Sequence, residues 1–173
     1  MTTLTSTVFS PPSDGARVHA LIDAQRTLPH SYSAVGATRT SAPAGMDVDH
    51  NRALLGHGEA AFASARDAVR QWRMFDLGWL QPVPPDEIRE GACAAIVTRT
   101  CGLWSVNVSR VVYVVDEPGR FGFAYGTLPH HAEAGEEGMT GVSPRFVINA
   151  ISNAITRGNT HSLTSMELLL AIK

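Results

Sequence analysis

The sequence has few cysteines, no long apolar segment and little net charge, and each of these absences excludes a class of protein. Two cysteines, Cys93 and Cys101, are too few for the disulfide framework of a small secreted protein. No window of about 18 apolar residues occurs, so no transmembrane helix and no membrane partner are predicted. A net charge of −2 gives no electrostatic reason to expect nucleic acid as a partner.

The N-terminal segment MTTLTSTVFSPPSDG has no basic stretch followed by an apolar run. It therefore does not have the pattern of a signal peptide, and the expected location is the cytoplasm. Because the cytoplasm keeps thiols reduced, we expect two reduced and mostly buried cysteines.

The motifs of several enzyme classes are also missing. We find no G-x-x-x-x-G-K-[ST] phosphate loop, no G-x-S-x-G nucleophile turn and no H-E-x-x-H zinc motif. The nearest approach to a metal cluster is His130-His131 followed by Glu133, Glu136 and Glu137, which we interpret as a solvated polar loop. No cofactor, no metal and no catalytic residue are predicted.

Residues 92–128 contain three β-like runs, and they are the clearest feature of the chain. The runs are 92–100, 105–115 and 121–128, separated by Cys101-Gly102 and by the turn-forming segment 116–120. This pattern predicts an antiparallel meander of three long strands.

Shorter elements precede the meander. We expect a helix over 14–25, a strand over 48–55, a helix over 59–73 and a strand over 75–83. The second helix is predicted from Phe62, Ala65, Val69 and Trp72, which lie at helical spacing on one side. The order of elements predicts an α+β fold in which an antiparallel curled sheet packs on a helix.

The region after residue 138 is predicted to be a C-terminal pair of helices. Ser143-Pro144 is a typical helix start, and a broad apolar face follows it as far as Arg157-Gly158. A second helix is predicted from Thr164 to the end of the sequence, because Thr164 and Glu167 have the spacing of a capping box.

Two groups of residues are candidates for ligand binding. Trp104, Tyr113, Phe123 and Tyr125 lie in the meander and are expected in the core or in the wall of a pocket. His50 and Arg52 are expected on the same side of the first strand, where they face either a ligand or water.

Much of the chain resembles a bacterial and plant family, the one numbered 1990 among domains of unknown function. The segments that carry the resemblance are YSAVGATR (32–39), VDHNRALLGHGEAAF (48–62), WRMFDLGW (72–79), GLWSVNVSRVVYVVDE (102–117) and RFGFAYGTLPHHAEAGEE (120–137). The strand order is similar to the start of a helix-grip fold, as in START-like and Bet v 1-like proteins. That architecture implies a pocket for a small apolar ligand, two further strands and a long C-terminal helix.

The end of the chain resembles another family, the PrkA-type serine protein kinases. GVSPRFVINAISNAI (141–155) and SLTSMELLLAIK (162–173) carry this resemblance. It implies that Arg145 is a nucleotide-sensing residue, although no phosphate loop accompanies it. We therefore expect a chimeric chain with three parts: a helical segment over 1–30, a truncated domain over 31–138 and a helical tail over 139–173.

Truncation near residue 138 has a structural consequence. If the two further strands are missing, the edge of the strand over 121–128 is unpaired, and self-association through that edge is expected.

Three functions remain open at this point. The first is a non-enzymatic domain that binds a small apolar ligand. The second is a small enzyme that uses His50 or the His130-His131 loop. The third is a fragment of a PrkA-like kinase that acts as an interaction or lid segment.

Overall fold

The computed structural model describes residues 8–9, 15–142 and 147–157, and side chains within 15–99 and 101–142. The helices are α1 (Gly15–Gln25) and α2 (Gly58–Arg70), with short 3-10 helices η1 (Ala37–Arg39) and η2 (Arg73–Phe75). The strands are β1 (Val8–Phe9), β2 (Asp47–His57), β3 (Leu80–Val83), β4 (Cys93–Thr100), β5 (Leu103–Glu117), β6 (Arg120–Thr127), β7 (Ala134–Val142) and β8 (Val147–Arg157).

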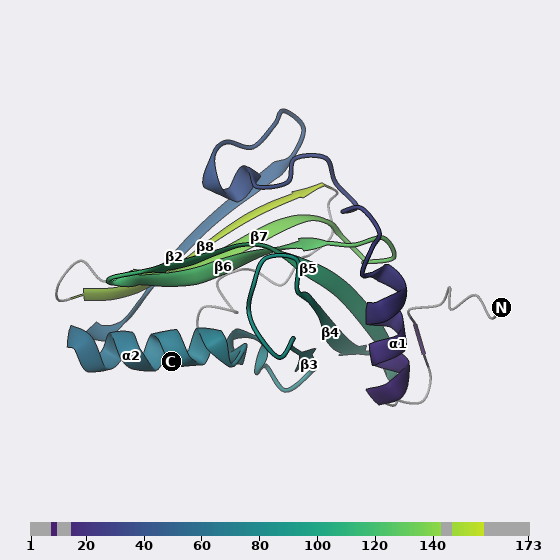
Figure 1. Ribbon diagram of the computed structural model, residues 1–173, viewed down its shortest axis with the longest axis horizontal. Helices are drawn as coiled ribbons and strands as arrows, with labels where there is room; N and C mark the ends of the chain where they lie inside the picture. Colours follow the sequence, from purple (N-terminus) through teal and green to yellow (C-terminus); the bar gives the residue numbers. More distant parts are fainter. Residues whose placement is uncertain (1–7, 10–14, 143–146, 158–173) are drawn as a thin grey trace.

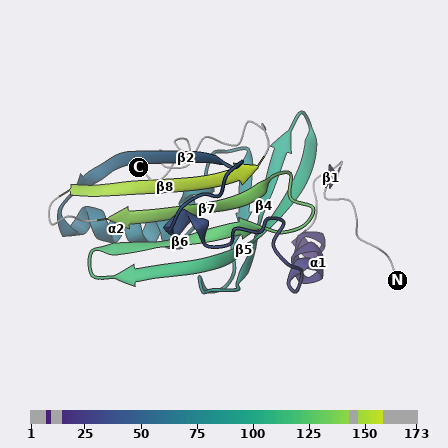
Figure 2. The ribbon, with the colours of Figure 1, turned by 90° about the horizontal axis from the view of Figure 1, so that it is seen from above.

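The strands form one curled antiparallel sheet with the order β2-β8-β7-β6-β5-β4-β3, and β1 pairs with β5 (Figures 1 and 2). Helix α2 lies against the face that we call the inner face, and α1 packs on the opposite, outer face where β4 and β5 lie (Figure 1). The α+β architecture predicted from the sequence is confirmed.

The predicted meander is confirmed as β4, β5 and β6. Cys101 and Gly102 both have positive φ, 50° and 78°, which is the geometry of a two-residue hairpin turn. The register of β5 against β6 shifts between Val111 and Tyr113. Because this bulge reverses the alternation, Val111 and Val114 both contact the inner core, whereas Tyr113 belongs to the outer face.

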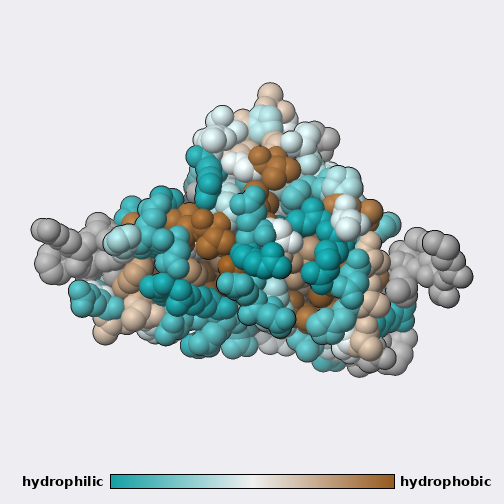
Figure 3. Space-filling view, viewed as in Figure 1, coloured by the Kyte–Doolittle hydropathy of each residue, from teal (hydrophilic) through white to brown (hydrophobic). Residues whose placement is uncertain are grey.

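The helical stripe predicted on α2 is buried as expected. Ala65 and Val69 are buried, and Phe62 packs against the inner core. The visible surface over α2 is mostly hydrophilic, with a hydrophobic patch above it at the level of the sheet (Figure 3). This is the distribution of an amphipathic helix that covers one face of a sheet.

The strand predicted over 75–83 is wrong in its first half, since β3 begins only at Leu80. Phe75 ends η2 and is buried, and Gly78 follows with φ 77°. Trp79 is 40% exposed. The alternation of apolar residues therefore came from a 3-10 helix and a bend, not from an extended strand.

The helix predicted between Ser143 and Arg157 is also wrong, because residues 147–157 form β8. This strand pairs with β7 on one side and with β2 on the other. Hydrogen-bonded ladders on both sides outweigh a local helical pattern, and the β-branched residues Val147, Ile148 and Ile151 suit a strand. The helix predicted from Thr164 lies outside the described residues, as does Arg145.

The unpaired edge predicted after β6 does not exist, since β6 pairs with β7 from Arg120 to Gly126. The prediction of self-association through that edge is therefore wrong. The strands at the two ends of the sheet path are β2 and β3. Strand β7 also runs through the proposed division at residue 138, so residues on both sides of it share one strand. No helix in the described part of the chain has the length and apolar character needed to cross a membrane.

Candidate functional site on the inner sheet face

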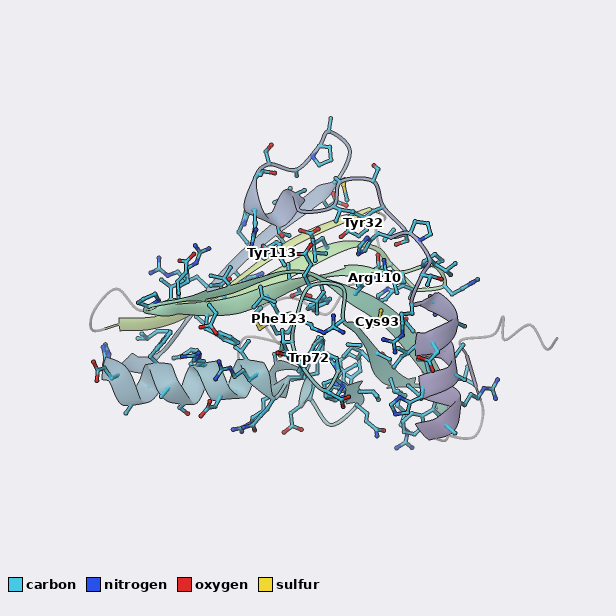
Figure 4. The ribbon with its side chains drawn as sticks, viewed as in Figure 1. Tyr32, Trp72, Cys93, Arg110, Tyr113 and Phe123 are labelled. Carbon is cyan, nitrogen blue, oxygen red and sulfur yellow. The ribbon has the colours of Figure 1, made fainter. Side chains whose placement is uncertain are left out.

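Four aromatic side chains gather on the inner face between the sheet and the end of α2. The ring centroid of Trp72 lies 4.8 Å from that of Phe123, 5.8 Å from that of Phe75 and 6.0 Å from that of Tyr125. Trp72 and Phe123 are both labelled on this side of the sheet in Figure 4. We call these four residues the aromatic cluster.

Trp72 reaches the cluster because the chain turns sharply after α2. Its backbone has φ 58°, a left-handed conformation that is unusual for a large side chain, and η2 begins at the next residue. The side chain is 1% exposed, yet its indole Nε1 has no hydrogen-bond partner among the described residues. A buried donor without an acceptor costs about 1–3 kcal/mol, so this N–H is a natural contact for a ligand oxygen.

A tyrosine–carboxylate pair adjoins the aromatic cluster. Tyr125 in β6 lies opposite Glu137 in β7, and its hydroxyl donates a hydrogen bond of 2.5 Å to the Glu137 carboxylate. Burial, and then the charge of Glu137, raise the pKa of Tyr125 well above its ordinary value. The phenol therefore remains a hydrogen-bond donor across the physiological pH range.

Taken together, these groups form a buried apolar core with few polar contacts, and each of the four aromatic residues is at most 9% exposed. Met139 and Val111 extend the apolar part of the same core. Trp72 offers one donor without a partner among the described residues, and Tyr125 and Glu137 form a hydrogen-bonded pair. The chemistry of these groups matches that of an apolar molecule with one polar end.

Of the residues predicted to bind a ligand, the structure brings together Phe123 and Tyr125. Trp72 was expected only in the core, and Glu137 was placed in a polar loop. The alternation of Glu137 and Met139 would have placed both on the inner face if β7 had been recognised as a strand.

The other predicted residues lie elsewhere, and their role stays a prediction. Tyr113 is on the outer face, where its hydroxyl is 2.9 Å from Thr38 Oγ1 (Figure 4). Trp104 is half-buried against the outer core beside α1. His50 and Arg52 are exposed on β2, an end strand of the sheet.

The outer face contains a second buried carboxylate, Glu136, which is 2% exposed. It accepts hydrogen bonds from the Tyr32 hydroxyl (2.8 Å), the Gly36 N–H (2.6 Å) and both the N–H (3.1 Å) and the hydroxyl of Thr38. Burial, and then this carboxylate, raise the pKa of Tyr32. These contacts attach residues 32–38 to the sheet, so we interpret Glu136 as structural.

The His130-His131 loop joins β6 to β7 and is only partly the solvated segment that was predicted. Burial lowers the pKa of His131 to about 4, and its Nδ1 accepts a hydrogen bond of 3.0 Å from the Glu133 N–H. The imidazole is therefore neutral near pH 7. Within the described residues, no group of three or more His, Cys, Asp or Glu is placed to hold a metal ion.

The two cysteines are free and differ in accessibility. Cys93 is buried, as expected, whereas Cys101 is exposed in the hairpin turn between β4 and β5. The expectation of two mostly buried thiols therefore holds for one of them.

Sequence comparisons match most of the chain to one family. The domain of unknown function DUF1990 matches residues 31–142. A UPF0548 protein of Deinococcus radiodurans is 34% identical over 138 residues, covering 73% of this chain and 70% of that protein. A UPF0548 protein of Dictyostelium discoideum is 32% identical over 156 residues, covering 81% of this chain and 68% of that protein.

The end of the chain matches a different family. The PrkA serine protein kinase C-terminal domain matches residues 120–173. The ATP-dependent protease PrkA of Bacillus subtilis is 46% identical over 41 residues, which are 24% of this chain and 6% of that protein. The two matched regions overlap over residues 120–142, in β6 and β7.

Solved structures share the fold at low sequence identity. The Bet v 1-like Ara h 8.0201 superposes with a TM-score of 0.53 and 10% identity, covering 74% of this chain and 95% of that one. The hypothetical protein jhp0584 from Helicobacter pylori gives a TM-score of 0.52 and 8% identity, covering 73% of this chain and 85% of that one. These likenesses establish the helix-grip type of fold.

Proposed function

The chain belongs to the DUF1990 family, and from its inner face we propose that it binds a small, mainly apolar molecule without transforming it. The observation that carries this proposal is the indole N–H of Trp72, which is buried within an aromatic cluster and lacks an acceptor among the described residues. The Bet v 1-like fold supports the proposal, since it places a curled sheet around an inner surface of this kind.

The chemistry of the inner face defines the ligand class. The aromatic rings pack at 4.8–6.1 Å from one another in a layer that is 0–9% exposed, and the polar groups within it are the Trp72 indole and the Tyr125–Glu137 pair. The proposed ligand is therefore an apolar ring or chain with one oxygen-bearing end. That end accepts a hydrogen bond from Trp72.

Two tyrosines provide a matched test of the binding face. Tyr125 and Tyr113 are equally buried, at 9% exposure, but lie on opposite faces of neighbouring strands. We expect Tyr125→Phe to weaken binding of the apolar sulfonate 1-anilinonaphthalene-8-sulfonate about fivefold or more, since the variant lacks the hydroxyl that donates to Glu137 and orients the polar groups of this face (about 1 kcal/mol or more for a bond to a charged group). Tyr113→Phe should leave binding unchanged.

The measurement is a fluorescence titration with both variants at equal folded fraction, together with native mass spectrometry for co-purifying molecules. Equal weakening by the two variants, or no saturable binding at all, would contradict the proposal.

The PrkA match favours a second candidate function, an interaction or lid segment that binds a nucleotide or an AAA+ partner through Arg145. This residue lies outside the described part of the chain. The candidate predicts ATP binding that is lost in Arg145→Ala. Isothermal titration calorimetry with ATP, carried out on the parent protein and on the Arg145→Ala variant, tests this candidate. Equal heats of binding for the two proteins would exclude it.

A further inference from the structure

A cavity of about 370 Å³ lies between α1 and residues 84–93, and none of the four residues of the aromatic cluster lines it. We propose that it binds small zwitterions, molecules that carry an ammonium and a carboxylate, of which α-amino acids are the simplest. Its volume is near the lower end of the range for small-molecule sites, roughly 300–1,000 Å³. Nothing in the proposed inner-face function uses these residues.

Two rigid elements form the walls of the cavity. His19 and Ile22 are three residues apart on one side of α1, and Arg26 follows in the turn directly after Gln25. The opposite wall begins with Pro84 and Pro85, whose rings fix the backbone φ. The site is therefore preformed in the absence of a ligand.

The floor of the cavity is apolar and made of short side chains. Ile22, Ala92 and Cys93 line it and are 5–6% exposed. Cys93 occupies the first position of β4 and is labelled beside α1 in Figure 4. This floor suits a short aliphatic group rather than a long chain.

The rim has charges of both signs. Arg26 and Arg89 line the cavity together with Asp86 and Glu87, while Asp23 holds the Arg26 guanidinium at 2.9 Å. None of the ion pairs found among the described residues uses Arg89, Asp86 or Glu87. These three groups thus have their charges available to a ligand.

This charge pattern selects a zwitterion. A simple anion would meet two carboxylates, and a simple cation would meet two guanidinium groups. A molecule with both charges can pair its carboxylate with Arg89 and its ammonium with Asp86 or Glu87. Because these pairs are near the surface and screened by water, we expect a dissociation constant in the millimolar range.

The two thiols allow a test with an internal reference. Cys93 lines the cavity, whereas Cys101 is exposed beyond the opposite end of β4. The rate of alkylation of each thiol by iodoacetamide is followed by peptide mass spectrometry with increasing L-leucine. At ten times its dissociation constant, leucine should slow the reaction of Cys93 roughly tenfold, because only empty sites react, and should leave Cys101 unchanged.

Matched ligands and variants test the zwitterion itself. 4-Methylpentanoate lacks the ammonium group and 3-methylbutylamine lacks the carboxylate, so each should protect Cys93 about threefold to fivefold less well than leucine. Arg89→Gln and Asp86→Asn should weaken protection by leucine, while Arg73→Gln, at an exposed residue that does not line the cavity, should not.

A second readout covers the case in which Cys93 reacts too slowly in the folded protein. His19 is on the rim, so leucine should shift the NMR resonances of its ring in a saturable manner. No shift of His19, equal protection of both thiols, or equal protection by the singly charged analogues would overturn the proposal. Because Tyr125→Phe alters only the inner face, it should not change any of these results.

Discussion

At the scale of single residues, neighbouring acidic residues have separate tasks because a strand alternates its side chains. Glu137 points to the inner face and accepts from Tyr125, whereas Glu136 points outward and holds Tyr32, Gly36 and Thr38. Glu137 is therefore a candidate ligand contact, whereas Glu136, one position earlier in the same strand, has a structural role.

The buried imidazole of His131 makes stability depend on pH. Its pKa falls from 6.5 to about 4 in the folded protein, so between these values the unfolded chain binds more protons. Stability should therefore fall as pH decreases from 6.5 to 4, by up to about 3 kcal/mol from this residue.

The variant His131→Asn tests this prediction, since its side-chain oxygen can still accept from the Glu133 N–H but does not titrate. Urea unfolding at pH 7 and pH 4.5 should show a smaller loss of stability for the variant than for the parent protein. Equal losses would show that other groups, such as His30, whose pKa is also lowered by burial, account for the dependence.

At the scale of elements, the segment with Tyr32 and η1 lies close against β6. A Cβ added at Gly126 would be 2.0 Å from the Tyr32 hydroxyl, a distance at which something must move. We expect Gly126→Ala to destabilise the protein by about 1–3 kcal/mol.

Gly141→Ala in β7 is the control, because a Cβ there would be 3.7 Å from its nearest neighbour, which is ordinary contact. Thermal unfolding of both variants gives the comparison. The close packing at Gly126 would be refuted by equal stabilities, or by a Gly126→Ala effect that persists unchanged after Tyr32→Ala.

The sequence predicted local elements well and long-range pairing poorly. The turns at Cys101-Gly102 and Pro118-Gly119 have clear signals, so β4, β5 and β6 were predicted with the right order. Residues 147–157 follow the helix-like start Ser143-Pro144 but are rich in β-branched residue types, and pairing with β2 and β7 on either side selects the strand. The same limit applies to the site: Phe123 and Tyr125 follow from alternation, whereas Trp72 requires the left-handed turn after α2.

At the scale of the whole molecule, β8 completes the sheet. It joins β7 to β2, a strand roughly 100 residues earlier in the chain, and so connects the two matched regions of the sequence in one fold. The sheet path from β2 to β7 therefore runs through this strand.

A proline in β8 tests its role. Asn153 lies opposite Gly138 on one side and His50 on the other, in the middle of both ladders. Asn153→Pro removes a backbone donor from a central strand, and we expect it to lower stability by about 3 kcal/mol or more. Asn153→Ser keeps the donor and should cost far less in chemical unfolding; similar effects of the two variants would contradict this topology.

The central claim is that the inner face binds an apolar ligand through Trp72, and NMR of the three indole N–H groups tests it most directly. Trp72→Phe assigns the resonance of interest, and the bound probe is 1-anilinonaphthalene-8-sulfonate. We predict a saturable shift of the Trp72 indole N–H resonance, because a sulfonate oxygen of the probe accepts a hydrogen bond from this group. The resonances of Trp79 and Trp104 should stay unchanged. Saturable binding that leaves the Trp72 resonance unmoved would contradict the claim.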